Sequence, residues 1–195
     1  MLRRLALLIL FALSALLPAS PVPNDGPKKH FHPTGKGTKW VYKSGSTRIA
    51  SKIDEVEVKG GETIVNIVFE EPNNKTSPVE TLLLNEKGVF RTRALGDEVD
   101  PPICLLKLPA KVGTKWSGKL DDFVIVDNST IVGIEEVEVP AGKFKAIRVE
   151  LNLQFKDITS IDTHLPTHWY VEGIGLVKSH IGKSISELVE FTPAK

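Results

Sequence analysis

Cysteine is almost absent from this chain, and the scarcity removes two classes of structure. Among 195 residues the only cysteine is Cys104, so no disulfide can form within the chain. Cys104 lies in the apolar stretch PPICLLKLP, where a small thiol is more simply a core residue than a nucleophile. No cysteine stands near the N-terminal segment, so a lipoprotein-type anchor has no attachment point there. We therefore expect stability to depend on the burial of apolar side chains.

The chain also lacks an excess of charge of either sign. It has 25 Lys and Arg against 24 Asp and Glu, and its formal net charge is +1. The charges are mixed along the sequence and form no basic patch, so we expect no nucleic-acid partner. A composition of 41% hydrophobic and 25% charged residues is typical of one globular domain.

Only one long hydrophobic run is present, at the start of the sequence. Arg3 and Arg4 precede an apolar run over residues 5–17, and small residues follow it. This pattern predicts a signal peptide over residues 1–20, because a membrane span needs about 20 apolar residues. We expect an exported protein, periplasmic or extracellular, whose mature chain has no integral membrane span. Residues 21–36, rich in Pro, Gly and Lys, are interpreted as a linker.

Helical periodicity is nearly absent from residues 37–193, which are interpreted as one β domain of short strands separated by turns. Apolar residues alternate with polar ones in the clearest strands: Val65, Ile67, Phe69, Ile147, Val149 and Leu151. Alternation places one face of a strand in a core and the other in water, which favours an antiparallel sheet. We expect these six side chains to share a common core.

Short motifs recur in the same order in the two halves of the β domain. GTKW occurs at residues 37–40 and 113–116, and further pairs follow it: DEVEV with EEVEV, and GVFR with GLVK. The pattern predicts two similar β units, about 37–110 and 112–191. Because neither unit is expected to bury its apolar face alone, we expect one strongly curved antiparallel sheet, either a partly closed barrel or a sandwich.

The GTKW motif has a structural and a functional interpretation. In the structural one, Gly permits a turn, Lys faces solvent, and Trp40 and Trp116 close the core. In the functional one, the two tryptophans are platforms on which a ligand stacks. The candidate ligand-binding residues are the following aromatic residues: Trp40, Trp116, Trp169 and Tyr170.

The second half carries motifs of a known kind: VPAGKFKAIRV at residues 139–149, WYVEGIGLVK at 169–178, and a closing Glu187-Leu188. They resemble the TapB-like family of exported bacterial proteins, which share VPAGxF, WYxxGxGLVK and a closing EL strand. The resemblance covers the second half well and the first half loosely. It implies an all-β envelope protein with no established reaction, and it supplies no catalytic residues.

Histidines raise the hypothesis of a zinc site, because His30 and His32 form HxH while His164 and His168 form HxxxH. Residues four apart on a strand are roughly 13 Å apart, too far to share one metal. Pro166 also blocks the helix that would bring His164 and His168 together. We therefore expect no metal, and we expect these histidines to be solvent-exposed.

Motifs for nucleotide binding and for serine hydrolysis are missing. Gly182-Lys183-Ser184 has the end of a phosphate-binding loop, but Val177 occupies the position of its first glycine. No GxSxG nucleophile elbow is present. We expect no cofactor.

Two functions remain open. The first is a non-enzymatic envelope protein that binds an apolar ligand or another envelope component, with the apolar run over residues 103–108 expected to be richest in groove or core residues. The alternative is a hydrolase acting on an envelope or extracellular polymer through carboxylates from separate strands. Asp121-Asp122 and Glu135-Glu136 cannot act as adjacent pairs, because neighbours on a strand point to opposite faces. Two unusually titrating carboxylates in one cleft would favour the hydrolase.

Overall fold

The structure is a computed structural model that describes residues 30–71, 73, 75–119, 124–155 and 166–195. The expected signal peptide and most of the expected linker lie outside the described residues. The same holds for Asp121, Asp122 and His164.

The described residues form twelve β-strands and almost no helix, so the predicted all-β fold is confirmed. The strands are β1 Lys39–Ser44, β2 Thr47–Lys59, β3 Glu62–Glu70, β4 Thr76–Asn85, β5 Gly88–Ala94, β6 Asp97–Lys107, β7 Lys115–Lys119, β8 Val124–Val139, β9 Gly142–Phe155, β10 Thr167–Val171, β11 Gly175–Ile181 and β12 Ser184–Thr192.

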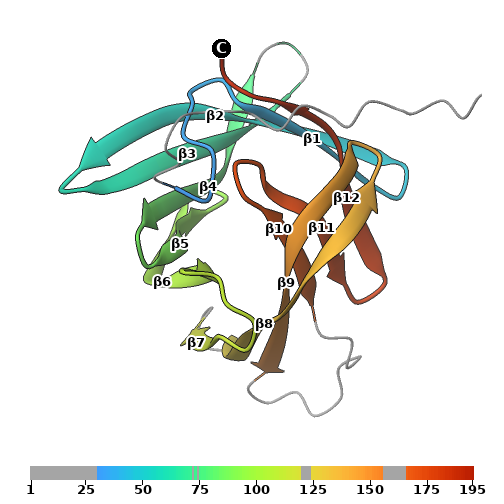
Figure 1. Ribbon diagram of the computed structural model, residues 1–195. Helices are drawn as coiled ribbons and strands as arrows, with labels where there is room; N and C mark the ends of the chain where they lie inside the picture. Colours follow the sequence, from blue (N-terminus) through green and yellow to red (C-terminus); the bar gives the residue numbers. More distant parts are fainter. Residues whose placement is uncertain (1–29, 72, 74, 120–123, 156–165) are drawn as a thin grey trace, which may run out of the picture.

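All twelve strands belong to one antiparallel sheet, which curls into a nearly closed barrel (Figure 1). Strands adjacent in sequence pair with each other, except that β1 pairs with β12 and leaves β6 and β7 as the two edges. The edge strands nevertheless contact each other across the seam. Of the two architectures expected from sequence, the sheet therefore takes the barrel-like one.

The seam between β6 and β7 is bridged by a tryptophan. Trp116 on β7 donates a hydrogen bond from Nε1 to the Cys104 carbonyl oxygen on β6, over 2.8 Å. Its ring is only 9% exposed and belongs to the core. Because a buried indole N–H needs an acceptor, this single bond both satisfies the ring and links the two edges.

The two GTKW copies have the same local structure. Gly37 and Gly113 have positive φ angles of 89° and 87°, and their N–H groups donate to the carbonyl oxygens of Ile53 and Ile131. The lysine of each copy is exposed and the tryptophan is buried. The structural interpretation of GTKW is thus confirmed, while the duplication of the two whole units stays a prediction.

The alternating residues are divided between a solid core and an internal cavity. Four of the six are buried: Val65, Ile67, Ile147 and Val149. Phe69 and Leu151 are only half-buried and line the cavity, which the buried Ile67 lines as well. The prediction of one shared core is therefore correct for four residues, while Leu151 packs against that core without full burial and Phe69 lies outside it.

Replacement of Trp116 by Phe tests the seam. The variant keeps an aromatic ring but leaves the Cys104 carbonyl without its donor, so we expect the free energy of unfolding to fall by about 1–3 kcal/mol. Urea denaturation measures the loss. Trp169→Phe is the matched control, because the Trp169 Nε1 donates to the Glu135 carboxylate, whose side chain is 41% exposed and accessible to water. Equal losses in the two variants would contradict a special role for the seam bond.

Candidate ligand-binding cavity

A cavity of about 490 Å³ lies inside the curved sheet. This volume falls within the range of sites that hold one small-molecule ligand. The lining comes from the segment before β1 and from strands in both halves of the sheet: Phe31, His32, Trp40, Tyr42, Ile49, Ser51, Ile67, Phe69, Val79, Glu80, Leu82, Val89, Arg91, Ile103, Cys104, Leu105, Ser129, Leu151, Pro166, His168, Tyr170, Gly175, Leu176, Ser179, Ile181 and Ser186. Most of these side chains are apolar or aromatic, so the cavity favours an apolar occupant.

One wall of the cavity is formed by Trp40 and by the segment that precedes β1. The His32 ring lies 5.4 Å from the Trp40 ring, and its Nδ1 donates to the Pro33 carbonyl oxygen over 2.9 Å. Burial lowers the pKa of His32, so its ring is held neutral. Gly175 allows this approach, since a Cβ there would lie 3.0 Å from His32 Cδ2. The second glycine of the WYxxGxGLVK motif therefore makes room for a residue far away in sequence.

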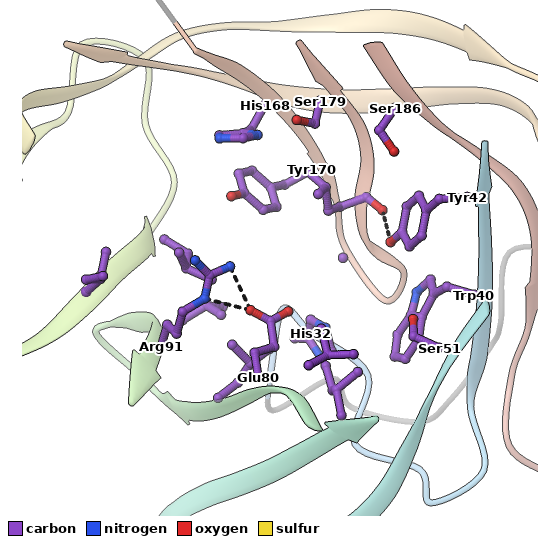
Figure 2. Close-up of a pocket in the computed structure, with 18 of the residues that line it drawn as sticks. His32, Trp40, Tyr42, Ser51, Glu80, Arg91, His168, Tyr170, Ser179 and Ser186 are labelled. Atoms are coloured by element: carbon purple, nitrogen blue, oxygen red, sulfur yellow. Dashed lines mark hydrogen bonds and ion pairs between the residues drawn. The ribbon is translucent and has the colours of Figure 1, made fainter. Parts of the chain in front are cut away.

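An ion pair lies inside the cavity. Arg91 on β5 donates from Nε and Nη2 to one oxygen of Glu80 on β4, each over 2.8 Å (Figure 2). The Glu80 side chain is 19% exposed and that of Arg91 is 32% exposed. Charges at such depth are tolerated because they neutralise each other.

Two tyrosines from different strands point into the cavity. Tyr42 on β1 donates its hydroxyl to the Leu176 carbonyl oxygen over 2.8 Å. Tyr170 on β10 makes no hydrogen bond through its hydroxyl to any described residue. Burial raises the pKa of both phenols, so both are neutral donors at neutral pH.

His168 follows the same face of β10 as Tyr170, with the two ring centroids 6.1 Å apart. Its Nδ1 is buried and has no hydrogen-bond partner among the described residues. Burial, and then the positive charge of Arg91, lower the pKa of His168 to about 4. His168 is therefore neutral at physiological pH. Its Nδ1 is available to hydrogen-bond a ligand.

Cys104 also lines the cavity, and Ile103 and Leu105 beside it do the same, while Leu106 is in the solid core. Residues 103–106 thus belong to the cavity wall or the core, while the expectation that the run over residues 103–108 is the richest in such residues stays a prediction. Burial raises the pKa of the Cys104 thiol to about 11. The thiol thus stays protonated and is a poor nucleophile.

The structure separates the four aromatic residues singled out from sequence. Trp40 and Tyr170 line the cavity, whereas Trp116 lies at the seam. Trp169 has the opposite orientation from its neighbours on β10, and its ring lies against Lys178 with the ammonium 5.9 Å from the ring centroid. Trp116 and Trp169 are not among the lining residues.

The expectation of solvent-exposed histidines is wrong for His30, His32 and His168, none of which is exposed. His30 Nε2 hydrogen-bonds Thr63 Oγ1 over 2.9 Å, and the other two line the cavity. His30 and His32 differ because their segment packs against the barrel instead of leaving it, and His168 differs because it stands at an inward position of β10. Within the described ranges, no group of three or more His, Cys, Asp or Glu side chains is arranged to hold a metal ion.

Sequence reasoning missed Glu80, Arg91 and His168 as site residues. Each stands at an inward position of its strand, in step with the buried Leu82, the buried Val89 and the cavity-lining Tyr170 respectively. A charged or polar residue at an inward position of an alternating strand was the available signal.

Comparisons with known proteins give one family model and two solved structures that this chain resembles. A family model described as DUF3108-like matches residues 114–184, which is less than half of the chain. A provisionally assigned lipoprotein from Parabacteroides distasonis has a similar structure, with a TM-score of 0.51 and 17% identity, over 86% of this chain and 100% of that one. A provisionally assigned exported protein with a YmcC-like fold from Bacteroides fragilis gives a TM-score of 0.45 and 17% identity, over 84% of this chain and 99% of that one.

No curated protein matches the chain. The TapB-like name is not confirmed and stays an interpretation of the motifs. Over the residues that the structure describes, there is no helix with the length and apolar character needed to cross a membrane.

The low pKa of His168 has a consequence for stability. Between about pH 6.5 and pH 4 the unfolded chain binds a proton on His168 that the folded chain does not, so stability falls as the pH is lowered through this range. We expect His168→Gln to remove this contribution, which amounts to about 3 kcal/mol at most. Urea midpoints of both proteins are measured across this pH range. The wild-type midpoint should fall relative to that of the variant as the pH is lowered, so the two curves should converge at low pH or cross. Parallel curves would contradict a buried, neutral His168.

Proposed function

We propose that this is an exported, non-enzymatic envelope protein that binds one apolar ligand inside its barrel. The observation that carries the proposal is the cavity itself, which is largely apolar and has the volume of a small-molecule site. A well-packed protein interior leaves few voids larger than a water molecule, so an unfilled space of this size is more than a packing defect.

The cavity has an apolar opening to solvent. Ile49 on β2 and Ile181 on β11 both line it, yet they are 39% and 53% exposed. They therefore lie where the cavity meets the surface. Exposed apolar side chains at the opening favour the entry of an apolar molecule.

An exported location rests on two supports. The N-terminal pattern predicts a signal peptide, and the Parabacteroides distasonis protein of similar fold carries a lipoprotein assignment. Both agree with a role in the cell envelope.

The hydrolase alternative finds less support in the cavity. Among the lining residues that the structure describes, the only carboxylate is Glu80, whereas the two-carboxylate mechanism needs a pair. Glu70 has a lowered pKa because Lys39 donates a hydrogen bond to it, but Glu70 does not line the cavity. Glu135 accepts hydrogen bonds from Arg148 and Trp169.

Filling the cavity tests the proposal. Ser186 on β12 points into the cavity, so Ser186→Trp should occupy part of it and lower the affinity for the fluorescent apolar probe N-phenyl-1-naphthylamine by at least about tenfold. The added ring is apolar, so binding to a nonspecific apolar surface would rise instead of falling.

Ile185→Trp is the matched control for this experiment. Ile185 is the neighbouring residue on β12, is 44% exposed, and is not among the lining residues. The control should bind the probe as wild type does, and circular dichroism should show the same fold in all three proteins. Wild-type affinity in Ser186→Trp would place binding outside the cavity and sink the proposal.

A further inference from the structure

Four polar side chains of the cavity lie on facing parts of its wall. Glu80 and Arg91 come from β4 and β5, while His168 and Tyr170 come from β10, on the other side of the interior (Figure 2). Electrostatic effects of Arg91 reach both His168 and Tyr170, so the four groups share one polar region. The remainder of the lining is mostly apolar. An occupant that fits both parts has an apolar body and one polar end.

The charges of this polar region cancel. Glu80 and Arg91 are paired, and His168 and Tyr170 are neutral for the reasons given above. The Cys104 thiol is protonated as well. The described residues that line the cavity therefore carry no net charge at neutral pH. A charged ligand would add a charge that nothing in the lining compensates, and such burial is costly.

The region nevertheless offers unused hydrogen-bonding groups. Tyr170 has a hydroxyl with no partner and His168 has a buried Nδ1 with no partner, within the part of the chain that the structure describes. Arg91 binds Glu80 through Nε and Nη2. Neutral donors and acceptors of this kind match a hydroxyl, ester or amide group of a ligand.

We infer that the ligand is an uncharged amphiphile, whose apolar chain lies against the apolar wall and whose hydroxyl, ester or amide head is bound by Tyr170 and His168. This inference rests on the proposed function and specifies its ligand class.

A charged head group would compete with the ion pair. An anion that displaced Glu80 from Arg91 would leave the Glu80 carboxylate, whose side chain is 19% exposed, without a partner, because no other side-chain bond of Glu80 is present within the described chain. A cation that bound Glu80 would leave Arg91 in the same position. A largely desolvated charge is costly to leave without its partner, so both exchanges are unfavourable.

Three probes with the same alkyl chain and different heads test the inference: monolaurin, laurate and dodecylamine. Their affinities are measured below micelle-forming concentrations at neutral pH by isothermal titration calorimetry. We expect the wild-type protein to bind uncharged monolaurin at least about tenfold more tightly than either charged probe.

Changing the charge of the cavity should change this preference. In Glu80→Gln the unpaired Arg91 should raise the affinity for laurate by about tenfold or more, and in Arg91→Gln the unpaired Glu80 should do the same for dodecylamine. Glu190→Gln is the matched control, because Glu190 pairs with Arg48 over 2.8 Å on the exposed surface. It should leave the order of affinities unchanged.

Tyr170→Phe covers the case in which the charge variants fail to fold. It keeps the cavity neutral but removes the free hydroxyl, and it should lower the affinity for monolaurin while leaving laurate and dodecylamine unaffected.

The outcomes separate the inference from the function on which it rests. Tighter binding of laurate or dodecylamine by the wild type, or equal binding of all three, would overturn the uncharged head group and leave apolar binding standing. Failure of all three probes to bind would overturn the proposed function itself.

Discussion

The contact between the two edge strands is the constraint on which the interior depends. An antiparallel sheet of twelve strands has two edges, and here β6 and β7 meet without forming a hydrogen-bonded ladder. Trp116 spans the gap through its bond to the Cys104 carbonyl. Closure turns one face of the sheet inward along its whole length, so every second residue of most strands faces either the core or the cavity. A flat sheet of the same strands would expose this face to water.

Core side chains fill one part of the interior, and another part is left open as the cavity. Buried side chains such as Ile131, Val149 and Leu188 fill part of the interior, whereas a cavity remains where Tyr42 and Tyr170 point inward. Leaving that space open forfeits contacts that larger side chains would make, and placing the Glu80–Arg91 pair there adds a desolvation cost. Proteins that give up stability at one place in the core usually do so at a functional site. The unfilled and partly charged region is therefore the part of this molecule least explained by folding alone.

Sequence predicted the class of fold because alternation and turn residues are local signals. The strand around Val149 and the positive φ of the GTKW glycines required no knowledge of distant partners. The cavity was not predictable in this way, because its polar region joins Glu80 and Arg91 to His168 and Tyr170 across the barrel. That meeting depends on how far the sheet curls, which no single strand encodes. Alternation did hold one unused clue: Trp169 and Tyr170 are neighbours on a strand, so only one of them could face inward.

Native mass spectrometry of the protein purified from the envelope of its own host tests the central claim most directly. The account predicts one small uncharged, chain-bearing molecule per protein chain, held through gentle ionisation and released by organic solvent. A mass equal to that of the protein chain alone, or a stoichiometric complex with a second protein and an empty cavity, would contradict it.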